Sequence, residues 1–274
     1  MIRFQSILGA LGFTAAAALA TTSLHADEIR LSDGRVLIGS VKVDGDEVRI
    51  RTRDGETVRV HKDDVIRIRT DDELREELLR LAEGHGGQAH ADLEIATLAR
   101  RYGLRKEMWA HLDACRETVS DGAVRERFEA FLATLGTELV GADRLSGSTE
   151  KKVRALLGTI KSSTPAIRVA AAEAALVAMQ DADKAIRLRA RGAASTRQRQ
   201  AALRVLTRRN VEHDPFVWRT AVSDRSESVR NEAARLVRES GRVEQAIAYL
   251  APGLGVPDGH ARIRTARAFA EFGS

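Results

Sequence analysis

The residues of this chain that could carry out chemistry are few, and their spacing does not assemble an active site. His85 and His90, with Asp92 and Glu94 close by, form the one histidine cluster of the sequence. Metal binding would need both imidazoles on one helical face and a third ligand. A separation of five residues does not provide that face, and the two glycines between the histidines favour a solvated loop. We therefore expect no metal site.

The other reactive side chains also lack the neighbours that chemistry would require. Cys115 is the only cysteine, so it cannot form an internal disulfide, and its apolar helical surroundings predict a small buried residue instead of a reactive thiol. His213-Asp214 is followed by Pro215, which is typical of a helix start. The sequence contains no nucleophile elbow, phosphate-binding loop, zinc-protease motif or dinucleotide motif. We expect a protein that is not an enzyme and holds no cofactor.

Charge is the property that most favours a binding role. Residues 150–274 hold 23 Lys and Arg against 13 Asp and Glu, a net charge of +10, whereas residues 27–149 hold 20 against 26, a net charge of −6. Only 4% of the residues are aromatic, which argues against ligand pockets and nucleic-acid stacking platforms built from rings. We expect a protein partner with an acidic surface, and no nucleic acid.

Five arginines of the basic half are the candidate binding residues. Some share one face of a helix, and others recur at the same register in successive repeats: Arg197, Arg204, Arg208, Arg235 and Arg267. A common surface of arginines attracts carboxylate-rich or phosphate-rich partners. The alternative is a solvated face, whose arginines pair with Glu232, Glu239 or the acidic half and have no binding role.

These arginines lie in residues 150–274, where a short sequence motif is repeated four times. Its key arginines are Arg168, Arg199, Arg230 and Arg262, which follow one another after 31, 31 and 32 residues. A period of this size is typical of stacked helical pairs. Four residues earlier stand side chains suited to capping a helix: Thr164, Ser195, Ser226 and Asp258. An apolar first helix precedes each cap, over 153–160, 185–193, 216–222 and 246–254, so we expect four helical pairs.

The segments Val229–Val237 and Ala261–Gly273 resemble the HEAT-like repeat family, in the short form found in many bacterial proteins and in phycobilin lyases. The resemblance covers about the last 45% of the chain. Gln198 departs from it, because an aliphatic residue is expected at that position. The resemblance implies an α-solenoid that serves as a protein-binding scaffold and carries no catalytic residue.

Residues 27–70 are predicted to form a small β-barrel similar to the SH3-like barrels. Five short apolar-alternating runs cover 28–31, 36–43, 47–53, 57–61 and 65–69, and three Asp-Gly pairs mark tight hairpins. Residues 62–64 are expected to form a single helical turn. The barrel contains no aromatic residue, so recognition of proline-rich peptides is not expected.

Residues 71–145 are predicted to be helical. A first helix carries Leu74, Leu78 and Leu81 on one stripe, a hairpin resembling one tetratricopeptide repeat follows, and a further helix covers 123–139. Residues 141–149 are rich in Gly and Ser and are interpreted as a linker to the repeats. The expected fold class is α+β, mostly α.

The first 26 residues have the pattern of a secretory signal peptide. Arg3 precedes an apolar run from Ile7 to Ala20, and Leu24-His25-Ala26 offers a cleavage site. A bilayer-spanning anchor is the alternative, but the run is shorter than the roughly 20 apolar residues that it would need. We expect a periplasmic or otherwise exported protein that is soluble after cleavage.

The function expected from the sequence is that of an exported, non-enzymatic scaffold that binds another envelope protein through the basic surface of its second helices. The alternatives are a lyase-like or enzyme-accessory role and the binding of an envelope polyanion. Phe269 and Phe272 at the end of the stack either turn inward or are covered by self-association, so a homo-oligomer is a further expectation.

Overall fold

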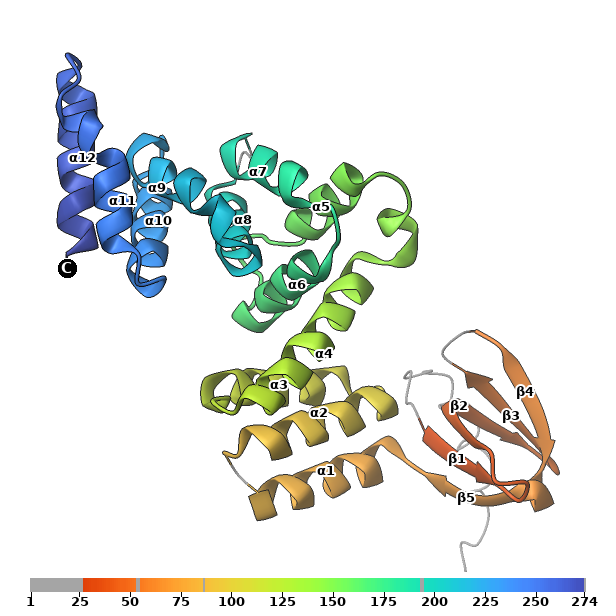
Figure 1. Ribbon diagram of the computed structural model, residues 1–274. Helices are drawn as coiled ribbons and strands as arrows, with labels where there is room; N and C mark the ends of the chain where they lie inside the picture. Colours follow the sequence, from red (N-terminus) through yellow and green to blue (C-terminus); the bar gives the residue numbers. More distant parts are fainter. Residues whose placement is uncertain (1–26, 53–54, 86, 193–194, 274) are drawn as a thin grey trace, which may run out of the picture. The chain divides into compact units, whose positions relative to one another are not determined.

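The computed structural model describes residues 27–52, 55–85, 87–192 and 195–273 (Figure 1). The predicted signal peptide lies outside these residues. The described residues form two compact units that divide close to residue 111, and each is described by itself. The class is α+β and mostly helical, as the sequence predicted. Among the described residues, no helix has both the length and the apolar character needed to cross a membrane.

The first unit begins with a five-stranded antiparallel sheet. Its strands are β1 (Asp27–Leu31), β2 (Val36–Asp44), β3 (Glu47–Thr52), β4 (Thr57–His61) and β5 (Val65–Arg69), in the spatial order β4-β3-β2-β1-β5. The turn η1 (Lys62–Asp64) separates the last two. Gly34, Gly45 and Gly55 have positive φ angles, as the predicted Asp-Gly turns require. The predicted strands are confirmed to within one residue at every described end.

Alternation along the strands buries one face of this sheet. Ile29, Leu31, Val48 and Ile50 form its core, and they come from two strands, β1 and β3. Arg69 at the end of β5 ties the sheet to the following helices: it donates to Glu28 on β1, to Glu77 on α1 (Asp71–His85) and to the Tyr102 hydroxyl on α2 (Ala89–Tyr102). The sheet is therefore bound to its helices by a part-buried charged network. The helix α3 (Arg105–Thr118) completes the predicted hairpin.

The second unit is a solenoid-like stack of helical pairs. After α4 (Gly122–Val140) and the turn η2 (Ala142–Leu145) come the pairs α5 (Thr149–Gly158) with α6 (Ala166–Ala178), α7 (Asp183–Gly192) with α8 (Thr196–Arg209), and α9 (Asp214–Ser223) with α10 (Glu227–Glu239). The turn η3 (Val211–His213) precedes α9. The last pair is α11 (Val243–Leu250), extended by η4 (Ala251–Leu254), with α12 (Gly259–Phe272).

Equivalent helices of successive pairs lie against one another. The second helices α6, α8, α10 and α12 contact in that order, and the first helices α5 and α7, then α9 and α11, do so as well (Figure 1). One continuous apolar core runs from Val140 to Phe272. Phe272 is 3% exposed and Phe269 packs against the same core, so the terminal aromatic pair turns inward. The four predicted helical pairs are thus present.

The relation of α4 to the repeats differs from the linker prediction. The sequence separated residues 71–145 from the repeats, whereas in the structure α4 packs along α6 within the second unit. Gly136 permits this contact, because an added Cβ would overlap the carbonyl oxygen of Ala171 and lie 2.8 Å from the Cβ of Ala175. The Gly- and Ser-rich segment contains the turn η2 and connects two helices of one unit.

Most of the predicted capping residues directly precede their helices, but most of them do not form the expected side-chain hydrogen bond. α8, α10 and α12 begin directly after Ser195, Ser226 and Asp258, yet only Asp258 accepts a side-chain bond, from the amide of His260. Pro165, and not Thr164, directly precedes α6. Thr164 instead accepts from the amide of Lys161 and holds the preceding turn.

Candidate binding surfaces of the repeats

The predicted arginine surface is an open groove along the second helices, with a volume of about 440 Å³. We call it the second-helix groove. Its lining residues come from α6, α8 and α10 and from the start of the following loop: Glu173, Arg204, Thr207, Arg208, Arg235, Leu236, Glu239, Ser240 and Arg242. Two of the five predicted binding arginines, Arg204 and Arg235, are joined here through one shared carboxylate, that of Glu232.

The charges of this groove form a ladder of ion pairs. Arg204 on α8 donates from Nε and Nη2 to Glu173 Oε1 on α6, at 2.9 and 2.6 Å, and from Nη1 to Glu232 Oε1 on α10, at 2.7 Å. Arg235 donates to Glu232 at 3.0 and 2.8 Å and also pairs with Glu239. We call these five residues the ion-pair ladder. It connects three successive second helices.

Burial and ion pairing shift the pKa values of the ladder residues. Removal from water raises the pKa of the Glu173 carboxyl, against the opposing effect of the Arg204 guanidinium. Although burial acts against them, the carboxylates of Glu173 and Glu232 raise the pKa of Arg204. Burial acts to raise the pKa of Glu232, but hydrogen bonds donated by Arg235 and Arg204 outweigh it, so the pKa of Glu232 is lowered. Each arginine of the ladder therefore has carboxylate partners inside the protein.

Of the remaining predicted arginines, Arg208 also lines this groove, whereas Arg197 and Arg267 are not among its lining residues. Arg208 pairs with Glu129 on α4 at 2.6 Å. Arg197 donates to the carbonyl oxygens of Ser162 and Thr164, in the loop of the preceding pair. Arg267 is exposed on α12, and no carboxylate of the described residues forms an ion pair with it. The alternative interpretation, that arginines of this face pair with Glu232 and Glu239, is confirmed for Arg204 and Arg235.

The arginines that mark the repeat period have a structural role. Arg230 donates to the carbonyl oxygen of Asp224, and Arg262 donates to those of Val256 and Pro257, so each fixes the loop before its own helix. Arg199 is 2% exposed, and its Nε and Nη2 both lie 3.1 Å from the Asp224 carboxylate. Arg199, Arg230 and Arg262 thus each bind a loop that precedes a second helix.

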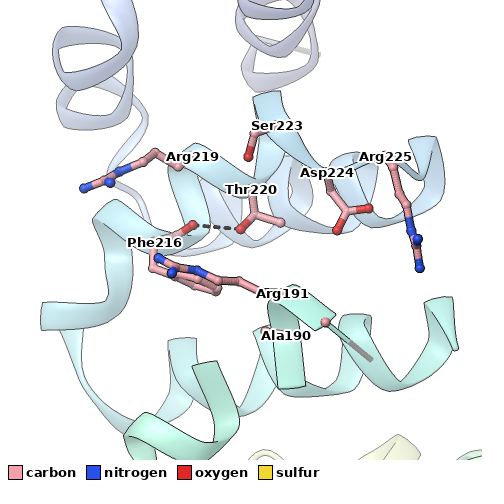
Figure 2. A pocket seen from close by; sticks show the side chains of 9 residues that line it. Ala190, Arg191, Phe216, Arg219, Thr220, Ser223, Asp224 and Arg225 are labelled. Atoms are coloured by element: carbon pink, nitrogen blue, oxygen red, sulfur yellow. Dashed lines mark hydrogen bonds between the residues drawn. The ribbon is translucent and has the colours of Figure 1, made fainter. Parts of the chain in front are cut away.

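A second groove lies on the other helices of the pairs, between α7 and α9, and has a volume of about 470 Å³ (Figure 2). We call it the first-helix groove. Its lining residues come from the end of α7, from α9 and from the loop after α9: Ala190, Arg191, Gly192, Phe216, Arg219, Thr220, Ser223, Asp224 and Arg225. None of these was among the predicted binding residues.

The three arginines of the first-helix groove differ from those of the ladder. Arg191, Arg219 and Arg225 are exposed, and within the described residues none of them forms an ion pair. Arg191 lies 5.2 Å from the ring centre of Phe216, and Arg219 lies 5.5 Å from that of Tyr249 on α11. The one acid of the groove, Asp224, is already paired with the buried Arg199. The groove therefore has a net positive charge that no internal partner cancels.

One sequence signal could have indicated this groove. Residues 184–211 contain nine Lys and Arg and no Asp or Glu. The ladder arginines find their acids in neighbouring helices, but α7 has only Asp183 at its first residue, and that carboxylate contacts Arg209 and His213. Although burial acts against it, Arg209 lowers the pKa of Asp183. The basic residues farther along α7 are left without this acid.

The candidate chemical residues remain apart. His85 ends α1 and His90 lies in the first turn of α2, and no group of three metal-ligating side chains occurs in the described part of the chain. Cys115 is buried, as its apolar surroundings predicted. His213 is also buried, with Nε2 3.2 Å from Asp183 Oδ2, and Asp214 opens α9 as Pro215 indicated.

Comparison with protein-family models, with curated proteins and with solved structures found no match for this chain.

Proposed function

We propose that this protein is an exported, non-enzymatic scaffold, whose stack of helical pairs binds an acidic protein of the cell envelope. The observation that carries the proposal is the open, arginine-lined surface of the stack, laid over one continuous core. Arg199, Arg204 and Arg209 form bonds between neighbouring helical pairs, so the pairs that line these surfaces are held together. Repeat stacks of this kind offer extended surfaces that suit protein partners.

The same proposal assigns the helical pairs to HEAT-like repeats and the N-terminal sheet to the SH3-like barrels. The sequence motif around Arg230 and Arg262 supports the first assignment, and the addition of β5 beside β1 supports the second. Export is supported by the signal-peptide pattern of residues 1–26.

Affinity capture followed by reconstitution tests the scaffold role. The chain starting at Asp27 serves as bait in envelope extract, and an unrelated protein of similar pI, near 9.7, serves as the control for capture by charge alone. A partner that is then produced separately should bind the purified chain at fixed stoichiometry. Failure of every captured protein to bind in the purified system would refute the scaffold role.

Cell fractionation tests export separately. The full chain should appear in the envelope fraction as a shorter form beginning at Asp27, and the chain without residues 1–26 should stay in the cytoplasm. Retention of the full-length chain in the cytoplasm would contradict export and leave the binding role to be judged on its own experiment.

A further inference from the structure

We infer that the first-helix groove, and not the predicted second-helix groove, is the site that holds the partner, and that its occupant is an acidic peptide segment carrying an apolar side chain. This inference rests on the proposed scaffold function and assigns it a surface and a ligand chemistry. Its starting point is the contrast between the two grooves: the arginines of the ladder are paired inside the protein, and those of the first-helix groove are not.

Paired and unpaired arginines differ in what they offer a partner. An incoming carboxylate at Arg204 would have to compete with Glu173 and Glu232, both of which already accept its hydrogen bonds. No carboxylate of the described residues accepts a hydrogen bond from Arg191 or Arg225. A guanidinium presents a planar set of donors that matches a carboxylate, so both arginines can donate hydrogen bonds to an acidic side chain.

The positions of the two arginines define the ends of the site. Arg191 ends the basic part of α7 and reaches over Phe216, near the start of α9, whereas Arg225 lies two residues beyond the end of α9 (Figure 2). The groove between them runs along α9. A segment lying in it would place one carboxylate near each end.

Apolar surface between the basic residues specifies the rest of the occupant. Phe216 and Ala190 line the groove itself. Along α7, a smaller hollow of about 260 Å³ is lined by Leu188 together with Lys184, Arg187, Arg191 and Glu150. Leu188 is 59% exposed, so an apolar side chain lies beside three basic residues and one acid, Glu150. A segment with an apolar residue among its carboxylates matches this arrangement.

The same features disfavour a densely charged polyanion. Arg191 and Arg219 lie against the rings of Phe216 and Tyr249, so these rings are engaged with guanidinium groups and form no stacking platform for bases. Asp224 also lines the groove, and its charge is balanced by a single arginine. Closely spaced phosphates would meet this carboxylate, whereas two separated carboxylates can avoid it.

Fluorescence anisotropy with a labelled peptide tests the inference on the chain starting at Asp27. The probe is a short peptide of glutamates with interspersed leucines; the comparison ligands are the same peptide with glutamine in place of glutamate, and polyphosphate. The test variant is Arg191→Glu with Arg225→Glu. The matched control is Arg264→Glu with Arg267→Glu, which makes the same change of net charge at exposed residues of α12.

The glutamate peptide should bind the unaltered chain and the α12 control alike, and its affinity should fall about tenfold or more in the groove variant, since two attractions become repulsions. Equal losses in both variants, absence of binding, equal binding of the glutamine peptide, or a preference for polyphosphate would overturn the inference. If circular dichroism shows that the groove variant is unfolded, Arg191→Gln with Arg225→Gln replaces it, with the same expected direction.

The outcomes also separate this inference from the scaffold proposal. A captured partner that binds the groove variant and the α12 control equally well would leave the scaffold role standing and remove the groove as its site. Peptide binding that depends on Arg191 and Arg225, in a protein that recruits no partner, would establish the site and count against the scaffold role.

Discussion

The ion-pair ladder is tested most directly by replacing Arg204 with methionine. This change keeps an apolar side chain of similar reach and removes the guanidinium that connects α6, α8 and α10. Glu173, whose side chain is 8% exposed, then loses the arginine that holds its charge inside the protein. Glu232 keeps Arg235, so Glu173 is the residue that determines the cost.

The loss of stability depends on whether Glu173 stays charged or binds a proton when Arg204 is removed. Removing one partner of a buried ion pair costs about 3–5 kcal/mol, because the other charge stays buried. A carboxyl group can avoid this by binding a proton, at about 1.4 kcal/mol for each pH unit above its ordinary pKa. From the ordinary value of 4.5 for Glu173, this limit is about 3 kcal/mol at pH 7.

Protonation of Glu173 also determines how the loss of stability changes with pH. A carboxyl group whose pKa is raised in the folded state destabilises the protein increasingly as the pH rises above its unfolded value. The deficit of Arg204→Met relative to the unaltered chain should therefore be largest near neutral pH and shrink toward zero as the pH falls toward 4.5. Urea unfolding followed by circular dichroism, at a series of pH values, measures it.

Two variants complete the design. Adding Glu173→Gln to Arg204→Met removes the unpaired charge and should restore most of the lost stability at pH 7. Arg267→Met changes the same register position on α12, where the arginine is exposed, and should alter stability by less than about 0.5 kcal/mol. If Arg204→Met proves as mild as Arg267→Met at pH 7, or its deficit grows as the pH falls, the ladder does not stabilise the stack as argued.

Three further predictions concern other parts of the repeats. Gly136→Ala should destabilise the second unit by about 1–3 kcal/mol in urea unfolding, since its Cβ would overlap α6, whereas Gly158→Ala, with open space around it, should not. Glu232→Gln should lower stability at neutral pH, and the difference should shrink as the pH falls below the ordinary pKa of 4.5 and vanish once the pH is below the lowered pKa of the folded state, because Glu232 contributes stability only while it is charged. Asp258→Ala should lower the melting temperature by removing a side-chain cap, and Ser226→Ala, which removes no such bond, should leave it unchanged.

Local patterns predicted most of the elements. Alternation and Asp-Gly turns gave the five strands, because a strand pair joined by a tight turn is decided within a few residues. The 31-residue period gave the helical pairs for a similar reason, since each pair repeats the same local periodicity. The burial of Cys115 also followed from the apolar face of its helix, whereas the sequence left open whether Phe272 packs inward, as it does, or is covered by self-association.

Contacts between distant residues were harder to predict. Arg204 and Glu173 are 31 residues apart, and Arg208 and Glu129 are 79 apart, so their pairing depends on how the helices stack. A helical wheel shows that arginines share a face and cannot show which acids face them. The packing of α4 on α6 was missed for the same reason, because Gly136 gives no sign in the sequence of the helix that approaches it.

Pairing thus divides the arginines of the repeats into two groups with different uses. One group bonds neighbouring pairs and loops, as Arg199, Arg204 and Arg230 do, and its positive charge is cancelled or directed at carbonyl oxygens. The other group, with Arg191 and Arg225, forms no ion pair with any acid of the described residues. The net charge of +10 for residues 150–274 shows that such an excess must exist, but it does not locate it. The ladder pairs its arginines inside the protein, whereas in the first-helix groove Arg191 and Arg225 form no ion pair and the one lining acid, Asp224, is bound to Arg199, so a partner's carboxylates could pair with these two arginines.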